Sequence, residues 1–137
     1  MEKADLSSEK SIGFAFSKEE RLCSKKHIEE LYKKGSSTFL YPFRVVYLSR
    51  SSSELASPFP KVLISVPKRL FKKAVDRNRI KRQIREIYRN NKRHLFEELE
   101  QEQIPVFLSI VYVGKEKLPF LQLERKLISI LLRFKKT

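Results

Sequence analysis

The stretch AVDRNRIKRQIRE, residues 74–86, combines an apolar row with dense positive charge. Apolar side chains recur through this stretch and the two residues after it, at Ile80, Ile84, Ile87 and Tyr88. Their i, i+4, i+7, i+8 spacing places all four on one face of an α-helix. Arginine and lysine occupy many of the positions between them, so the other faces of the helix are cationic. We therefore expect this helix to bury one face in a protein core and to present the others to a polyanion.

The charge of the whole chain is concentrated around this helix. The 137 residues include 30 Lys and Arg against 16 Asp and Glu, which gives a formal net charge of +14. Twelve of the cations, but only two of the acids, lie between Lys68 and Arg93. Such a local excess indicates nucleic acid or an anionic membrane surface as the partner.

The spacing of the cations favours partner binding over simple solvation. A charged helix face is usually solvated and stabilised by ion pairs between residues four apart. Here Lys81, Arg85 and Arg89 form such a row of like charge, and most of the acids needed for pairing are missing. Like charges at this spacing repel each other and destabilise the helix slightly. A phosphate-bearing partner would neutralise these charges and remove that repulsion. Arginine is also well suited to bidentate contact with phosphate.

Length and composition predict one domain preceded by an arm. Residues 1–18 are polar and aperiodic, which predicts a flexible N-terminal arm, and residues 19–137 are expected to form a single domain. Cys23 is the only cysteine, so a disulfide within the chain is impossible and a reducing compartment fits. The first residues contain no signal-peptide core. We expect a cytoplasmic protein.

Periodicity and turn signals predict three helices and three or four strands. The expected helices are residues 25–34 (ended by Gly35), 74–90 (capped by Asp76) and 119–134; the expected strands are residues 37–40, 43–48, 61–66 and 106–113. Residues 92–103 either extend the basic helix or begin a connector. This order predicts one sheet with helices packed on it.

The sequence predicts no catalytic residue and no metal site in the polypeptide. Its only aspartates are Asp5 and Asp76, and its two histidines, His27 and His94, show no ligand spacing. Glycine-rich phosphate-binding motifs are absent from the sequence. The chain has 10 Phe and 5 Tyr, most of which we expect in the core, while one or two at an open sheet edge would be able to stack on unpaired bases.

Two consecutive segments, KVLISVPKR (residues 61–69) and KAVDRNRIKRQIRE (residues 73–86), resemble the protein subunit of bacterial ribonuclease P. The family pattern is a strand ending in S-V-x-K-K/R, a short turn, and A-V-x-R-N-x-x-K-R-x-x-R-E on a helix. The resemblance covers about residues 18–134. It implies an α/β (α+β) two-layer sandwich of order α-β-β-β-α-β-α with a left-handed βαβ crossover, whereas the general rule predicts a right-handed one.

The resemblance also implies a function. The polypeptide would be the accessory, RNA-binding subunit of an endoribonuclease that removes the 5′ leader of precursor tRNA, with catalysis carried out by an RNA subunit and its bound Mg²⁺. The family implies neither a metal on the polypeptide nor an obligate protein partner.

The site residues follow from the same resemblance. Those implied to face the catalytic RNA are Lys68, Arg69, Lys72, Lys73, Arg77, Asn78, Arg79, Lys81, Arg82, Arg85 and Arg89. Many family members have Gly-Asn where this chain has Lys72-Lys73. The 5′ leader would lie in a cleft between the sheet and the first helix. Tyr32 and Ile28, at positions where the family often carries Phe, would line that cleft, with Phe43 and Tyr47 as further candidates.

Two other functions stay open at this point. A structural RNA-binding protein of the ribosomal type, without a catalytic partner, would share the charge and the fold class. A membrane-surface or calmodulin-binding protein would use the basic amphipathic helix. This second alternative needs the apolar row at Ile80, Ile84 and Ile87 to be free, whereas we expect it to be a core contact.

Overall fold

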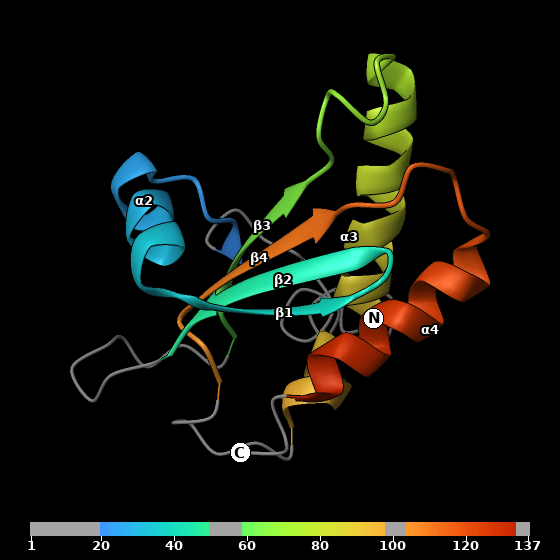
Figure 1. Ribbon diagram of the computed structural model, residues 1–137. Coiled ribbons are helices and arrows are strands. Elements are labelled where there is room, and N and C mark those ends of the chain that lie inside the picture. Colours follow the sequence, from blue (N-terminus) through green and yellow to red (C-terminus); the bar gives the residue numbers. More distant parts are fainter. Residues whose placement is uncertain (1–19, 50–58, 98–103, 134–137) are drawn as a thin grey trace, which may run out of the picture.

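Four strands and three helices make up the part of the chain that the computed structural model describes, residues 20–49, 59–97 and 104–133 (Figure 1). They are α2 (Lys25–Lys34), β1 (Ser36–Leu40), β2 (Phe43–Leu48), β3 (Lys61–Ser65), α3 (Ala74–Phe96), β4 (Phe107–Tyr112) and α4 (Phe120–Leu131). Every helix and strand expected from the sequence is therefore confirmed in type and order. The basic helix α3 is longer than expected, because residues 91–96 extend it to 23 residues. The expected arm at 1–18 lies outside the described residues.

The strands form one mixed sheet of order β1-β2-β4-β3. β1 pairs with β2, and β2 with β4, in antiparallel fashion, whereas β3 runs parallel to β4. At the outer edge of β3, the N–H of Leu22 donates to the carbonyl of Val62 over 2.8 Å. The start of the described chain therefore lies along the β3 edge.

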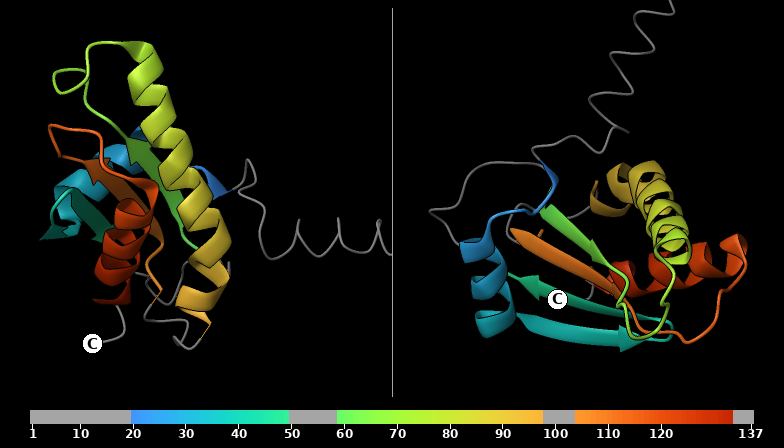
Figure 2. Two further views of the ribbon diagram at one scale, coloured as in Figure 1. Left: turned by 90° about the vertical axis from the view of Figure 1, so that its right-hand side faces the viewer. Right: turned by 90° about the horizontal axis from the view of Figure 1, so that it is seen from above.

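The connection from β3 through α3 to β4 is left-handed. Seen from the side of α3 with β3 and β4 pointing upward, β4 lies to the left of β3 (Figures 1 and 2). About 98% of such crossovers in proteins are right-handed. The handedness implied by the resemblance is confirmed against that general rule.

The helices cover the two faces of the sheet unequally (Figure 2). α3 and α4 pack side by side on one face and form the main two layers with the sheet, while α2 crosses only part of the other face. The larger core lies between α3, α4 and the sheet, and a smaller one lies under α2. We call the first side of the sheet the closed face and the second the open face.

Local signals explain where α2 begins and ends. The Ser24 hydroxyl accepts a hydrogen bond from the N–H of His27 over 3.4 Å at the N-cap. Gly35 ends the helix, and its N–H donates to the carbonyl of Leu31 over 2.8 Å. A Cβ atom at Gly35 would lie 2.8 Å from the carbonyl oxygen of Tyr47, so a larger residue would push α2 away from β2. The expected stop at Gly35 is confirmed.

The expected cap of α3 is wrong. The N-cap residue is Lys73, which makes no capping hydrogen bond with its side chain, and Asp76 lies one turn further in. The Asp76 carboxylate instead pairs with Lys117 Nζ at 2.9 Å, which ties the start of α3 to the segment before α4.

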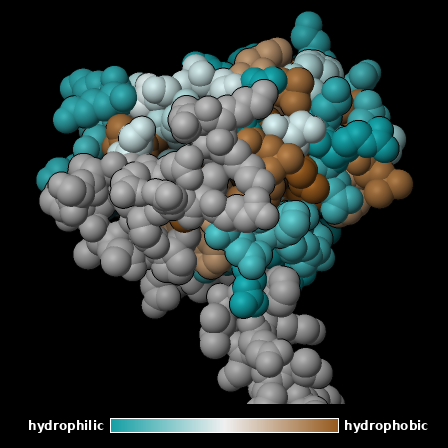
Figure 3. Space-filling model, turned by 90° about the horizontal axis from the view of Figure 1, so that it is seen from below, coloured by the Kyte–Doolittle hydropathy of each residue, from teal (hydrophilic) through white to brown (hydrophobic). Residues whose placement is uncertain are grey.

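The final helix packs as the sequence predicted. Leu123, Leu127 and Leu131 are buried on one side of α4, while Phe134 lies outside the described residues. Leu121 is 68% exposed on the same helix. Seen from below, apolar atoms gather on the right-hand side, where α4 lies, bordered by polar atoms (Figure 3).

Candidate nucleic-acid interface

The apolar row of α3 is fully inside the protein. Ile80, Ile84, Ile87 and Tyr88 are at most 2% exposed and pack against the closed face of the sheet. A membrane-surface or peptide-binding helix would need this row to be free. The structure therefore removes the basis for that alternative and leaves the cationic faces of α3 outward.

Most of the predicted RNA-facing residues point to solvent. They divide into an exposed set (Lys68, Arg69, Lys72, Lys73, Asn78, Arg79 and Arg82) and a half-buried set (Arg77, Lys81, Arg85 and Arg89). The first four lie on the connection from β3 to α3, and the others lie on the first five turns of the helix. The structure thus brings these residues together into one region, which we call the basic surface.

Arg77 differs from its neighbours on the basic surface. Its Nη1 donates hydrogen bonds to the carbonyl of Phe71 over 2.8 Å and to the carbonyl of Lys72 over 2.9 Å. The side chain therefore turns back onto the preceding connection. The resemblance placed it against RNA, and this geometry gives it a contact within the protein.

Two further cations have acidic partners that the sequence did not reveal. Arg89 pairs with Glu86 at 2.7 Å, so the like-charged row is compensated at its end. Hydrogen bonds from Arg89 and Asn90 lower the pKa of Glu86 below its usual value. Lys92, counted above with the basic segment, is fully buried, pairs with Glu20 and lies over the Phe59 ring at 4.8 Å. It therefore belongs to the core.

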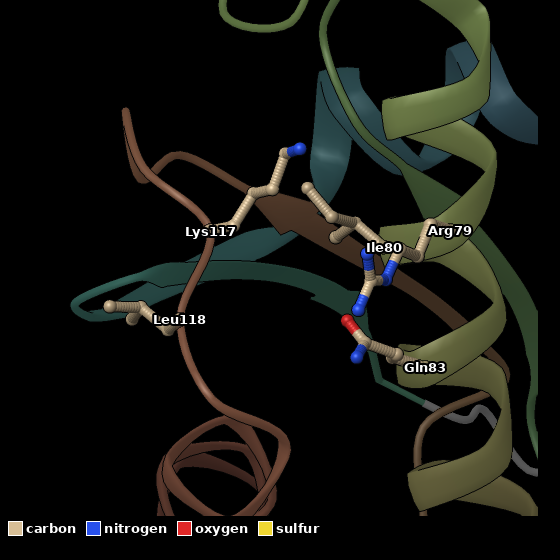
Figure 4. A pocket seen from close by; sticks show the side chains of 5 residues that line it. All are labelled: Arg79, Ile80, Gln83, Lys117 and Leu118. Atoms are coloured by element: carbon tan, nitrogen blue, oxygen red, sulfur yellow. The ribbon is translucent and has the colours of Figure 1, made fainter.

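A small notch lies between α3 and the segment that precedes α4 (Figure 4). Its lining consists of Arg79, Ile80, Gln83, Lys117 and Leu118. The side chains of Arg79 and Gln83 point toward one another in it. The hydrogen bond from Lys117 lowers the pKa of Asp76 beside this notch, so the carboxylate remains ionised. Lys117 is a cation next to the basic surface that the sequence analysis did not assign.

Among the described residues, no helix covers a row of the open face that runs across all four strands. The pairing register places Phe39, Arg44, Val111 and Ser65 side by side. Phe39 and Arg44 are exposed, and the other two are half-buried. The next rows lie under α2, where Val46 and Phe107 pack against Leu31. Helix α2 therefore borders an open strip of sheet.

Tyr32 stands at the border of this strip. Its ring is 48% exposed, and its hydroxyl lies 2.6 Å from the hydroxyl of Ser109, a buried residue of β4. Ile28 is half-buried and packs into the small core under α2. Both residues therefore lie where the resemblance implied, between the first helix and the sheet.

The other two cleft candidates lie on the wrong side of the sheet. Phe43 is fully buried on the closed face, edge-on to Tyr112 with ring centroids 5.8 Å apart. Tyr47 is also on the closed face, half-buried against the larger core. Because side chains alternate along a strand, both residues point away from α2, and the expectation that they line the cleft is wrong.

Comparison with known proteins identifies the family. The family model described as Ribonuclease P matches residues 16–135 of this chain. The chain belongs to the ribonuclease P protein family. It is 38% identical over 120 residues to the ribonuclease P protein component of Porphyromonas gingivalis, which covers 88% of this chain and 86% of the relative. The corresponding protein of Pseudoalteromonas atlantica is 38% identical over 104 residues, covering 76% of this chain and 74% of the relative.

Solved ribonuclease P proteins share the fold. A mutant of the Staphylococcus aureus ribonuclease P protein, described as defective in mRNA degradation activity, superposes with a TM-score of 0.67 at 26% identity. The alignment covers 87% of this chain and 90% of that one. The Thermotoga maritima ribonuclease P protein gives a TM-score of 0.63 at 25% identity, with coverage of 82% and 96%.

In this ribonuclease P family member, Phe39 and Arg44 are candidate RNA contacts that the sequence analysis missed. They lie directly opposite each other in the β1–β2 register. The signal that would have found them is the alternation of β2, in which Arg44 points away from Phe43 and Val45. The hairpin register then brings Phe39 to the same face.

Two features are absent from the described ranges of this ribonuclease P family member. Within 20–49, 59–97 and 104–133, no three His, Cys, Asp or Glu side chains come together in a group that would hold a metal ion. Over the same ranges, no helix combines the length and apolar character required to cross a membrane.

Proposed function

We propose that this chain is the protein subunit of a ribonuclease P ribonucleoprotein and that it binds two RNAs. The basic surface binds the catalytic RNA subunit, and the strip beside α2 binds the 5′ leader of precursor tRNA. The observation that carries this proposal is the concentration of exposed cations around a helix whose apolar row is completely buried. Membership of the ribonuclease P family supports it.

The basic surface suits the backbone of a folded RNA. Its cations lie on one connection and along one helix, and neutralising phosphates with such groups releases counterions. With about six to eight phosphate contacts, affinity falls steeply as the salt concentration rises. The contacts are to phosphates and therefore carry little sequence information.

The strip beside α2 suits unpaired nucleotides. Single-stranded RNA is commonly bound by aromatic rings that stack on bases and by cations that pair with the backbone. Tyr32 and Phe39 offer exposed rings, and Arg44 offers a guanidinium between strands β1 and β4. The bond between Tyr32 and Ser109 holds one of these rings against the sheet.

The polypeptide contributes binding and orientation to the reaction. The reaction is hydrolysis of a phosphodiester, which leaves a 5′-phosphate on the mature tRNA. Mg²⁺ supplies the Lewis-acid chemistry when bound, and the family resemblance assigns it to the RNA subunit. The residues described here offer no cluster of ligands that fits this ion. We therefore assign no step of the hydrolysis to a side chain.

The direct test is cleavage of precursor tRNA by purified protein, by the cognate RNA subunit, and by both together. The protein alone should leave the precursor intact, and the mixture should cleave faster than the RNA subunit alone at moderate salt. Cleavage of the leader by RNA-free protein with Mg²⁺ would contradict the assignment. RNA recovered with the protein from cells separates the ribosomal-type alternative, which requires bulk ribosomal RNA in place of one catalytic RNA.

A pair of double variants tests the docking surface. Arg82→Ala with Arg85→Ala should weaken binding to the RNA subunit and reduce the slope of log affinity against log salt by roughly 1.4 to 1.8, two phosphate contacts. Arg125→Ala with Lys126→Ala on α4 is the matched control and should leave the slope unchanged. An unchanged slope in the Arg82 and Arg85 variant would show that the docking face is wrongly assigned.

A further inference from the structure

The connection from β3 to α3 carries four exposed cations and is fixed at its centre. Lys68, Arg69, Lys72 and Lys73 surround Leu70 and Phe71. The N–H groups of Leu70 and Phe71 both donate to the carbonyl of Pro67, over 3.2 Å and 3.4 Å. We call residues 67–73 the basic loop.

Two contacts hold the basic loop on the protein. Phe71 is 8% exposed and packs near Tyr112, with ring centroids 5.9 Å apart. Arg77 Nη1 binds the carbonyls of Phe71 and Lys72 at 2.8 Å and 2.9 Å. One contact therefore fixes the side chain at the centre of the loop, and the other fixes the backbone at Phe71 and Lys72, where the second pair of cations begins.

The place of Arg77 on the helix turns its side chain toward the basic loop. It precedes Ile80 by three residues and Ile84 by seven, so it lies on the same side of α3 as the buried row. Its half-buried side chain runs along the end of the core toward the loop. The exposed neighbours Asn78 and Arg79 point elsewhere on the helix.

The chemistry favours arginine for this position. Neighbouring like charges in a short loop repel one another, and a flexible loop loses backbone freedom when it binds a partner. A planar guanidinium that binds two successive carbonyls reduces that freedom before binding. It also brings its positive charge against carbonyl oxygens, where charge-assisted hydrogen bonds form.

We propose that Arg77 is a positioning residue that holds the basic loop in its RNA-binding conformation and does not itself bind a phosphate. The inference rests on the proposed function, because it concerns how the same surface engages RNA. It changes the role of one motif residue from a contact with RNA to a contact within the protein that acts through Lys72 and Lys73.

A double-mutant cycle on RNA binding distinguishes the two roles. The variants are Arg77→Ala, Lys72→Ala with Lys73→Ala, and the triple combination, each measured against the RNA subunit over a range of salt. Arg77→Ala alone should weaken binding roughly tenfold, in line with the loss of charge-assisted hydrogen bonds, and should reduce the salt slope by more than one phosphate contact. In the background that lacks both lysines, its effect should shrink to about twofold or less, because coupled residues are not additive.

Arg82→Ala is the matched control in the same cycle. Arg82 is proposed to contact phosphate directly. Its loss should therefore lower the slope of log affinity against log salt by one phosphate contact, roughly 0.7 to 0.9, whether or not Lys72 and Lys73 are present. If Arg77→Ala behaves as this control does, Arg77 binds phosphate directly and the proposal is wrong.

Hydrogen exchange on the RNA-free protein tests the loop separately. Amide exchange at residues 68–73 should accelerate about tenfold in Arg77→Ala and stay unchanged in Arg82→Ala, because only the first variant releases the loop. Arg77→Lys, which keeps the charge but ends about one bond short of the Nη1 position that reaches both carbonyls, should exchange nearly as fast as Arg77→Ala and serves as the second variant if the alanine protein does not fold. Unchanged exchange in both Arg77 variants would overturn the proposal. Failure of the wild-type protein to bind the RNA subunit would instead contradict the proposed function.

Discussion

The two faces of the sheet are made by the same strands and differ in almost every physical property. On the closed face, Phe43 and Tyr112 are paired across β2 and β4 and are fully buried beneath helices. In the adjacent row of the sheet, Arg44 and Val111 are paired on the open face. Arg44 is exposed and opposes Phe39, which is 57% exposed.

The difference shows how a small domain separates stability from binding. Burial of apolar side chains on the closed face supplies most of the favourable free energy of folding. The open strip contributes little to that burial and remains accessible to a ligand. Substitutions on the closed face should therefore change the free energy of unfolding, and substitutions on the open face should change the binding of RNA.

Truncation of one phenylalanine on each face gives the largest expected contrast. Phe43→Ala should lower the free energy of unfolding by about 3–5 kcal/mol, because it removes a fully buried ring and leaves a cavity. Phe39→Ala should change it by about 0.5 kcal/mol or less, as at most surface sites. Denaturant unfolding measures both. Equal losses would mean that the open strip is also part of the core.

The buried cation beneath the closed face gives the next largest effect. Glu20→Gln removes the carboxylate that pairs with fully buried Lys92. It should cost about 3 kcal/mol of unfolding free energy, the lower end for breaking a buried ion pair. Glu86→Gln, which breaks the exposed pair with Arg89, should cost about 0.5 kcal/mol or less.

The double variant provides the control for this second prediction. Adding Lys92→Met to Glu20→Gln should recover much of the loss, because an apolar side chain of similar size needs no ionic partner. No recovery would show that Glu20 stabilises the protein by some contact other than the ion pair.

The tyrosines of the closed face predict a loss of stability at alkaline pH. Burial raises the pKa of Tyr112 to about 12 and raises the pKa of Tyr88 well above its usual value. Unfolded tyrosine ionises near pH 10, so these groups favour the folded state fully below about pH 10, and that contribution is lost as pH rises toward 12. Tyrosinate absorbance and the unfolding midpoint should be followed together against pH. Ionisation of all tyrosines near pH 10 in the folded protein would contradict the burial argument.

A modest loss of stability, together with a selective effect on binding, is expected at Tyr32 on the border of the open strip. Tyr32→Phe should cost about 1 kcal/mol through loss of the bond to Ser109, while keeping a ring for stacking. Tyr32→Ala should in addition weaken binding of precursor tRNA more than that of mature tRNA, by up to about 1–3 kcal/mol for one stacked base. Tyr41→Ala, at a comparably exposed tyrosine between β1 and β2, is the control. Equal weakening of both tRNAs by Tyr32→Ala would argue against a leader site here.

The order of the elements was predictable from the sequence because each signal is local. The apolar row of α3 identified its buried side, and Gly35 marked the end of α2. The crossover handedness did not follow from such signals. It depends on how β3, α3 and β4 pack together, and the expectation came from the family resemblance.

The errors at individual residues have a different cause. Phe43 and Tyr47 were expected in a cleft because they are aromatic, but aromatic content does not say which face of a strand is covered. Lys92 was counted with the surface charge, although Glu20, far away in sequence, pairs with it inside the protein. Residue type predicted the chemistry of these side chains, and only the tertiary structure showed their partners.

The length of α3 sets a geometric condition on any partner. Its 23 residues span about 35 Å at 1.5 Å per residue, and its packing against α4 and β3 leaves little freedom to bend. An RNA that contacts both the Lys73 end and the Arg93 end must therefore bring its phosphates within reach at two places about that far apart. A flexible strand loses conformational entropy when it is ordered to meet this condition, whereas a rigid, folded RNA already holds its phosphates at that separation before binding. On the proposed function, the protein would therefore select its RNA partner by size and shape, without contacts to the bases.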